Sequence, residues 1–443
     1  RQRQMCIRDS NYQLKRKMKR TSAITQLLTV LLLAGCSQNE VTDVNPDSHP
    51  AVGFGVYTGL ATRGVDMTTE SMKDSPSDAE KYGGFGIMGY FTGQETFENV
   101  KNTVTAGYMY NQAVEYDSKT SAWTYSPVKY WPNRDGDKIS FFAYAPYESN
   151  GQSGTKTGIT ISAATEAGIP YINFSLKKEN ELTKMVDLVV ADALDQQYTQ
   201  ANGGKVSFNF KHTLSRISFK AKLGSGDFTG MDGNNSFVYI THMWIVGKDH
   251  GTTAESGNLS LTNLSAASNP GSKFYTSAKW SQLHWNYENA VIPDKDFSLD
   301  NILALEKEGI IETDATTGHE GSVKGIKLTA ESQKTPVSLF PEKQYLYLIP
   351  VGDNDADVTK NSGCAEGDIK IGFHYDIVTK DNTSSGSSKY IASHAESVIS
   401  LPKGHMKRNE SYLYTLQINL HEIKIEEAKV ENWSDITNDV TIE

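Results

Sequence analysis

The chain has 443 residues, enough for about two or three domains at roughly 150 residues each. Hydrophobic residues make up 38% of it and aromatic residues 10%, which excludes a disordered chain because the apolar surface suffices for a core. The net charge of −10 provides no cationic field for a phosphate backbone, so nucleic acid is excluded as an expected partner.

The amino-terminal region indicates export and a lipid anchor. We expect residues 1–17, which include Cys6, to be translated adapter sequence or a misassigned start, because they match neither a signal nor a domain. Residues 18–35 combine two cations with an apolar run too short to span a bilayer, as in a secretory signal peptide. The letters LAGC ending at Cys36 resemble the lipobox of bacterial lipoproteins, which implies lipidation of Cys36. The alternative is an ordinary signal peptide with a chance cysteine.

A polar stretch, residues 36–50, is typical of a flexible tether. From residue 51 onward, apolar residues alternate with polar or small ones, which predicts half-buried strands and no long helix. The first such run is AVGFGVYT, where Val52, Phe54 and Val56 share one face. The later runs are FGIMGYF, KISFFAYAP, KVSFNFKH, RISFKAKL, FVYITHMWIVG, KQYLYLIPV, IKIGFHYDIV and SYLYTLQINLHEIKI. In the last run Tyr412, Tyr414, Leu416, Ile418 and Leu420 share one face.

Clusters of Gly, Asn, Asp and Ser separate these strands and have the chemistry of turns. Many short strands joined by such turns predict an all-β fold of antiparallel β-sandwiches rather than βαβ units. A glycine-rich stretch after residue 224 is the expected domain boundary. We therefore predict an N-terminal sandwich over residues 51–224 and a C-terminal sandwich over residues 225–443.

Motifs of catalysis and of cofactor binding do not emerge from the sequence. It contains no HExxH, GxSxG or GxxxxGK[ST] pattern. The glycines of GFGIMG, residues 84–89, match GxGxxG in form, but they lie in an alternating strand rather than before a helix. Asp353, Asp355 and Asp357 have the spacing of an EF-hand without its sixth and twelfth residues, which leaves only a looser calcium site open. We predict no enzyme, no metal and no cofactor.

For two single residues and one aromatic cluster we expect a structural role rather than a catalytic or binding role. We expect Cys364 to be a loop residue rather than a nucleophile, and His212 to be packed or hydrogen-bonded rather than a ligand. Aromatic residues crowd one segment and are expected to pack in the core, with stacking on a glycan as the alternative. They are Trp123, Tyr125, Tyr130, Trp131, Tyr144 and Tyr147.

Three segments together carry a resemblance to a known family. They are YWPNRDGDKISFFAYAPY, DLVVADA with FNFKHTLSRISFK, and NESYLYTLQINL…VENWSD, and they follow a lipobox. In this order they resemble the fimbrillin-like proteins of anaerobic Bacteroidota-type bacteria, the subunits of type V pili. The resemblance implies two tandem transthyretin-like β-sandwich domains, export as a lipoprotein of the outer membrane, and a role in surface fimbriae and adhesion.

The resemblance also implies a maturation step at the first strand. In related pilins an arginine-specific protease removes this strand, and a neighbouring subunit fills the resulting groove with a donor strand. The turn after the first strand contains Arg63 and Gly64, which are the candidate cleavage site. Cleavage there would also sever the lipid anchor at Cys36. The alternative is an ordinary solvent-facing arginine.

The carboxy-terminal run supplies the candidate donor strand. Its candidate residues are Ile423, Ile425, Val430 and Trp433, although the same run could complete its own sandwich. The implied partners are other fimbrial subunits in a homo- or hetero-polymer, the outer membrane through the lipid, an arginine-specific protease, and a host or bacterial surface ligand. The alternative function is a surface-anchored glycan- or protein-binding lipoprotein that does not polymerise. An enzyme on a sandwich scaffold is a third, weaker reading.

Overall fold

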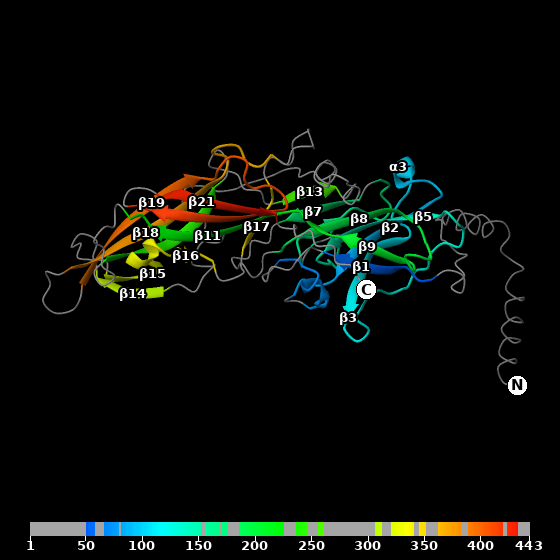
Figure 1. Ribbon diagram of the computed structural model, residues 1–443, viewed down its shortest axis with the longest axis horizontal. Coiled ribbons are helices and arrows are strands. Elements are labelled where there is room, and N and C mark those ends of the chain that lie inside the picture. The colour runs from blue at the N-terminus through cyan, green and yellow to red at the C-terminus, as the bar shows by residue number, and fades with distance from the viewer. Residues whose placement is uncertain are drawn as a thin grey trace, which may run out of the picture. The chain divides into compact units, whose positions relative to one another are not determined.

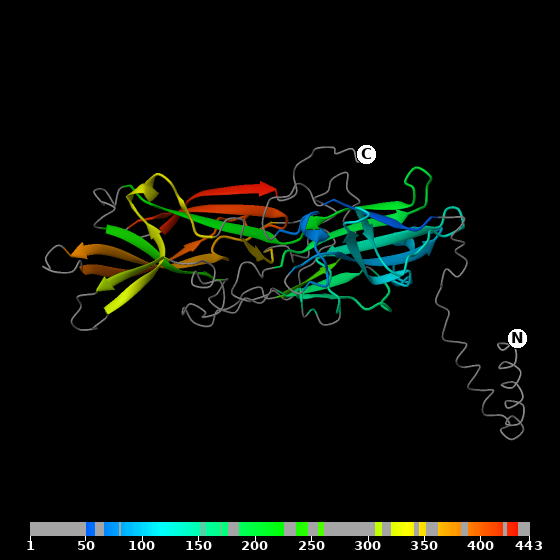
Figure 2. The ribbon, with the colours of Figure 1, turned by 90° about the horizontal axis from the view of Figure 1, so that it is seen from below.

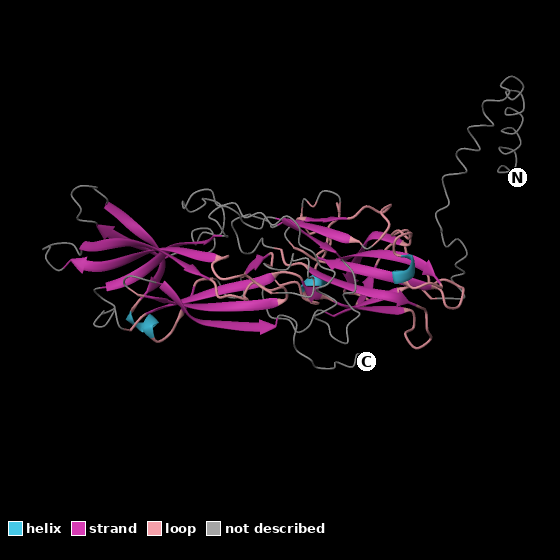
Figure 3. Cartoon of the chain, turned by 90° about the horizontal axis from the view of Figure 1, so that it is seen from above, coloured by secondary structure: helices cyan, strands magenta, loops and turns pink. Residues whose placement is uncertain are grey.

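The structure is a computed structural model, and it describes fifteen stretches of the chain with gaps between them. They are residues 50–57, 66–78, 81–151, 154, 156–168, 170–175, 186–225, 236–246, 256–260, 306–311, 320–340, 345–350, 362–381, 389–419 and 423–432. Strands dominate these stretches, and the only helical elements in them are α3 (Phe97–Val100), η1 (Ser71–Lys73) and η4 (Ala330–Gln333) (Figure 1 and Figure 3). Among the residues described, no helix is long and apolar enough to cross a bilayer. The all-β prediction is confirmed.

The first half of the described chain is built on one six-strand sheet. Its strands, in spatial order, are β10 (Lys211–His212), β8 (Val189–Gln196), β5 (Lys138–Ala145), β2 (Phe85–Gly93), β3 (Met109–Asp117) and β4 (Ala122–Thr124). The pairs within this sheet are antiparallel. Successive side chains of a strand point to opposite faces of its sheet. Nearly all residues of β5 are buried, so both faces of the sheet are covered there.

Smaller sheets accompany the two faces of the six-strand sheet. One is the β1–β9 pair, formed by β1 (Gly53–Tyr57) and β9 (Lys205–Asn209), which run parallel. The other consists of β6 (Ile159–Ile161), β7 (Tyr171–Ser175) and β13 (Ser256–Ser260). Phe141 and Ala143 of β5 join a core with the β1–β9 pair, whereas Phe142 and Tyr144 join a core with β6 and β7.

The burial of individual strands corrects one sequence-based expectation. The prediction of half-buried strands is right for β9, in which Val206 and Phe208 are buried between exposed residues. It is wrong for β2 and β5, which are buried on both faces because a layer covers each side of their sheet. Alternation in their sequences separates two apolar faces rather than a core face from a solvent face.

Two further sheets contain most of the second half. The β11–β20 sheet has the order β16 (Val337–Ser338), β11 (Ser215–Leu223), β20 (Glu410–Ile418) and β21 (Ile423–Asn432), and β17 (Leu346–Leu348) also pairs with β11. The β12–β18 sheet has the order β14 (Glu306–Ile311), β15 (Glu320–Leu328), β12 (Ser236–Val246), β18 (Lys370–Asp381) and β19 (Lys389–Ser400). The two sheets contribute to one hydrophobic core (Figure 2).

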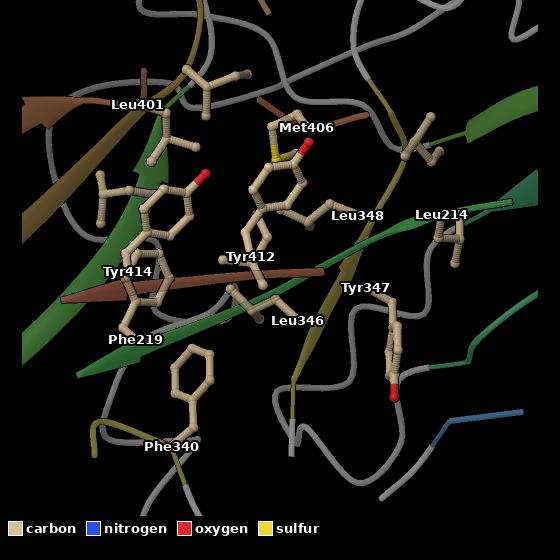
Figure 4. Packing of buried hydrophobic residues seen from close by; sticks show 14 of the residues in the cluster. Leu214, Phe219, Phe340, Leu346, Tyr347, Leu348, Leu401, Met406, Tyr412 and Tyr414 are labelled. Atoms are coloured by element: carbon tan, nitrogen blue, oxygen red, sulfur yellow. The ribbon is translucent and has the colours of Figure 1, made fainter. Parts of the chain in front are cut away.

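Aromatic rings fill much of the β11–β20 side of this core. Phe219 stacks on Tyr414 with ring centroids 5.4 Å apart, and Phe340 meets Phe219 edge-on at 5.7 Å (Figure 4). Tyr412 and Tyr414 are parallel, with their centroids 6.0 Å apart. The predicted inward face of this strand is confirmed for Tyr412, Tyr414, Leu416 and Ile418, and Leu420 lies outside the described residues.

Strand pairing crosses the boundary expected between residues 224 and 225. β11 precedes that boundary, yet it pairs with β20 in parallel and with β17 antiparallel. β13 follows the boundary, yet it pairs with β7. The expected division therefore does not separate the sheets, and the number and limits of the domains stay a prediction.

Candidate functional site

The candidate site is β1 and the surfaces that bury it. Its alternating sequence places Val52 and Phe54 in the core, with exposed fractions of 1% and 3%. Burial of a Val or Phe side chain stabilises a fold by about 1.5–3 kcal/mol. The first strand predicted from the sequence is confirmed, and it is part of the core rather than an accessory to it.

Phe54 lies among three aromatic rings from three other parts of the chain. Its ring centroid is 5.3 Å from that of Tyr125, 5.6 Å from that of Phe141 and 5.8 Å from that of Phe208. Tyr125 donates its hydroxyl hydrogen to the Val52 carbonyl oxygen at 2.8 Å. Burial raises the pKa of Tyr125 to about 12, so this hydroxyl is a neutral donor near neutral pH. The pocket around the Phe54 ring is thus aromatic.

A second set of hydrogen bonds holds the start of β1. The Val52 N–H donates to the Lys129 carbonyl oxygen and the Gly53 N–H to the Gly204 carbonyl oxygen, each at 2.9 Å. The indole N–H of buried Trp131 donates to the same Gly204 oxygen at 2.9 Å. Gly204 has a φ of +79°, and a Cβ atom there would lie 2.9 Å from Pro50. Only glycine suits this turn, because both its conformation and its contacts exclude a side chain.

The partner strand β9 pairs with β1 alone among the described strands. Departure of β1 would therefore leave the main-chain groups on that edge of β9 without their partners. It would also uncover the rings that surround Phe54. The site can thus accept a strand, with main-chain groups for affinity and an aromatic pocket for a large apolar side chain.

The predicted processing and lipidation residues lie outside the described part of the chain. Arg63 and Gly64 belong to residues 58–65, which join the end of β1 to Asp66, and Cys36 belongs to the undescribed amino-terminal stretch. The other arginines that follow Cys36 in the sequence are Arg134, Arg216 and Arg408. Arg134 is exposed in a turn, whereas Arg216 and Arg408 are buried, with exposed fractions of 5% and 0%.

The candidate donor residues occupy the edge of the β11–β20 sheet. Ile423, Ile425 and Val430 lie in β21, which pairs antiparallel with β20, and Trp433 lies outside the described residues. Ile423 is 4% exposed and Val430 is 44% exposed. In this structure β21 therefore extends its own sheet. This arrangement is the alternative to strand donation that the sequence analysis left open.

His212 and Cys364, the two single residues considered in the sequence analysis, are both buried. His212 is buried and its Nδ1 lies 2.9 Å from an Asp187 oxygen, so the hydrogen-bonded structural role is confirmed. Cys364 is buried outside the helices and strands, and burial raises the pKa of its thiol. Among the described residues, no group of three His, Cys, Asp or Glu side chains could hold a metal ion. Asp353, Asp355 and Asp357, considered for a looser calcium site, lie outside the described residues.

Four of the six aromatic residues considered for glycan stacking pack in a core or against one. Trp131 and Tyr144 are fully buried. Trp123 meets Phe85 edge-on at 5.1 Å between centroids and Tyr116 at 5.3 Å. The expectation of packing is confirmed for Trp123, Tyr125, Trp131 and Tyr144, whereas Tyr130 and Tyr147 are partly exposed. The glycines of GFGIMG lie in and beside β2, not ahead of a helix.

Comparison with known proteins gives three concordant results. The sequence model of a family described as Fimbrillin-like matches residues 77–371. A curated relative, "Fimbrium subunit Fim1C" from Phocaeicola vulgatus, is 30% identical over 425 residues, covering 95% of this chain and 99% of the relative. A crystal structure of a fimbrial protein from Bacteroides vulgatus superposes with a TM-score of 0.66 at 25% identity, covering 86% of this chain and 99% of that chain.

Proposed function

Because this chain belongs to the fimbrillin-like family, we propose that it serves as a structural subunit of cell-surface fimbriae and supports adhesion to a host or bacterial surface. A family of structural subunits favours assembly over catalysis. In this proposal Cys36 is lipidated and holds the exported precursor at the outer membrane. An arginine-specific protease then cuts between Arg63 and Gly64, β1 leaves, and subunits join by donor-strand exchange.

The observation that carries this proposal is the burial of β1 on a strand with no other described partner. Phe54 is surrounded by aromatic rings, and β9 pairs with β1 alone among the described strands. Removal of β1 would open a groove with a free strand edge and an apolar floor. Such a groove is stable in water only when another strand fills it.

The distribution of arginines supports Arg63 as the cleavage site. Arg216 and Arg408 are buried, so a protease cannot reach them in the folded chain. Arg134 is exposed, but its turn is closed by a hydrogen bond from the Asp137 N–H to the Arg134 carbonyl oxygen at 3.2 Å. A cut after Arg63 alone would separate β1 and the lipid anchor from the rest of the subunit.

The donor segment in this proposal is the carboxy-terminal segment of a neighbouring subunit, with Ile423, Ile425, Val430 and Trp433. β21 is an edge strand of its sheet, so its departure breaks pairing with β20 and with no other described strand. Copies of this chain or other fimbrial subunits would supply or receive the segment.

One observation favours the second candidate function, a surface-anchored glycan- or protein-binding lipoprotein that does not polymerise. β21 pairs with β20 through most of its length, from Ile423 to Asn432, and thereby completes its own sheet. A chain whose tail stays there and whose first strand stays on β9 would remain a monomer at the membrane.

The test compares purified chains beginning after Cys36, in an Arg134→Lys background that removes the exposed Arg134 and leaves Arg63 together with the two buried arginines. Cleavage by an arginine-specific protease should convert a monomer into oligomers on size exclusion, and deletion of residues 51–63 should do the same. The Arg63→Lys chain is the control and should stay monomeric. A cut chain that loses β1 yet remains a folded monomer would contradict strand exchange.

A further inference from the structure

A buried polar cluster surrounds the two residues that follow the undescribed stretch containing Arg63. Its centre is formed by Asp66 and Met67. The side chains that hold them come from Asp187, His212, Arg216 and Tyr347. Asp66 and these four residues have exposed fractions of 5% or less. The proposed assembly mechanism uses none of these contacts.

The carboxylate of Asp66 is held by the β11–β20 sheet. One oxygen pairs with the Arg216 guanidinium, and the other accepts the Tyr347 hydroxyl hydrogen at 2.5 Å. The Tyr347 hydroxyl points away from the other labelled core side chains (Figure 4). Arg216 is itself fixed, because its Nε donates to the Ser411 hydroxyl at 2.9 Å and its guanidinium lies 4.4 Å from the centroid of the Tyr345 ring.

The next residue is held by the six-strand sheet. The Met67 N–H donates to an Asp187 carboxylate oxygen at 2.7 Å, and the same oxygen lies 2.9 Å from His212 Nδ1. Asp187 lies two residues before β8, and His212 is in β10. Two consecutive residues are therefore bound to two different sheets, Asp66 to one and Met67 to the other.

Four of the residues around this pair come from segments that carry the family resemblance. Asp187 opens DLVVADA, His212 and Arg216 lie in FNFKHTLSRISFK, and Ser411 lies in NESYLYTLQINL. These segments are far apart in the sequence, yet they converge on one short piece of chain. Packing of strands alone does not require buried charges at such positions, because an apolar side chain would be accommodated more readily.

We propose that Asp66 and Met67 form a two-point anchor that keeps the chain from Asp66 onward bound to both sheets after β1 has left. This proposal rests on the proposed removal of β1 by cleavage after Arg63. The leaving piece ends at Arg63 and contains no anchor residue, whereas the new start carries only Gly64 and Val65 ahead of Asp66. The anchor thus links the β8–β10 region to β11, β17 and β20 in the mature subunit.

Breaking the anchor is costly for a physical reason. Loss of one partner removes a hydrogen bond or ion pair from a charged or polar group that is shielded from water. The free chain end created by cleavage would otherwise fray, as chain termini commonly do. The anchor prevents that fraying from uncovering the sheets on either side.

The experiment measures hydrogen–deuterium exchange of residues 66–73 in the chain beginning after Cys36. Tyr347→Phe removes one hydroxyl from Asp66, and Asp187→Ala removes the acceptor of the Met67 N–H. Each should raise the exchange rate of residues 66–73 by about tenfold, the factor expected for loss of one buried hydrogen bond to a charged group. Unchanged exchange in both variants would overturn the proposal.

The matched control is Tyr144→Phe, which removes a buried hydroxyl that donates to Asn111 at 2.6 Å, away from the anchor. This substitution should leave the exchange rate of residues 66–73 unchanged. A rise in that rate equal to the rise in the anchor variants would also overturn the proposal. After cleavage at Arg63, residues 205–209 of β9 should lose protection while residues 66–73 keep it. If the protein is never cut in cells, the proposed function fails, but exchange in the uncut chain still tests the anchor.

Discussion

Phe54 of β1 stacks on Phe208 of β9, with ring centroids 5.8 Å apart and ring planes 22° from parallel. The two strands run parallel, with Phe54 opposite Val206 and Val56 opposite Phe208. The first strand is thus joined to its partner through both main chain and core. A precursor that keeps β1 has a closed core, and a chain that loses it has an open one.

The first prediction concerns Phe54→Ala. The substitution should lower the free energy of unfolding of the uncut chain by about 3–5 kcal/mol, because it leaves a cavity among three aromatic rings. Urea denaturation measures the change. Val398→Ala is the control, since Val398 is 46% exposed and its truncation should cost less than about 0.5 kcal/mol.

The Phe54→Ala variant also shows whether β1 leaves the chain after cleavage or stays bound to β9. Once the chain is cut after Arg63 and β1 is released, residue 54 is no longer present and the variant should equal the wild type in stability. A difference that persists after cleavage would show that β1 remains bound to β9.

The second prediction separates the structural and donor roles of the carboxy-terminal segment. Ile423→Ala should destabilise the monomer by about 2–5 kcal/mol, because Ile423 is buried and pairs with Ile418. Trp433→Ala should reduce oligomer formation by the cut chain. Full assembly by the Trp433 variant would remove Trp433 from the donor candidates.

The third prediction concerns pH. Burial raises the pKa of the Asp187 carboxyl, opposed by the neighbouring His212 and reinforced by the charge of Asp66. The folded chain then holds this proton at a higher pH than the unfolded chain, whose Asp pKa is about 3.9. The stability that this proton contributes is present below that value and lost as pH rises through the raised pKa.

Asp187→Asn tests this sign because asparagine does not titrate. The free energy of unfolding of the wild type minus that of the variant should fall as the pH rises above about 3.9, the pKa of an Asp in the unfolded chain. Urea denaturation at each pH gives both values. A difference that grows with pH would mean that pairing with His212 outweighs burial.

The fourth prediction concerns Cys364. Its thiol is 2% exposed and lies 3.3 Å from the Pro402 carbonyl oxygen, and burial raises its pKa. Both effects suppress the reactive thiolate. A thiol reagent should therefore label the native chain at least about tenfold more slowly than the urea-unfolded chain. Equal rates would place the thiol at the surface in solution.

Local patterns in the sequence predicted strands well. The alternation of Val52 and Phe54 gave β1 its inward face, and the alternation of Tyr412 and Tyr414 did the same for β20. Such patterns depend only on the period of two in a strand. They do not determine which strand lies beside which, so the sequence did not indicate the parallel pairs β1–β9 and β11–β20 within a fold that is otherwise antiparallel among the described strands.

Long-range pairing also explains why the sequence did not indicate that strands on either side of residue 224 share sheets, or that Asp66 is buried beside Arg216. A glycine-rich stretch suggested a division after residue 224, but β11 pairs with β20 nearly two hundred residues later. Asp66 and Arg216 are ordinary charged residues in the sequence, and only folding brings them together across 150 positions. Two charged residues beside apolar runs could have pointed to a buried ion pair: Asp187 before β8 and Arg216 within β11. Charged residues are seldom buried unless they are paired.

The most direct test of the account is the amino-terminal sequence of the protein in fibres sheared from the cell surface, with an unboiled gel of the same material. The account predicts a start at Gly64 and a ladder of oligomers that heating collapses to one band. Arg63→Lys should abolish both, whereas Arg134→Lys should change neither. A lipidated Cys36 terminus with a single unboiled band would contradict the account and identify an anchored lipoprotein that does not polymerise.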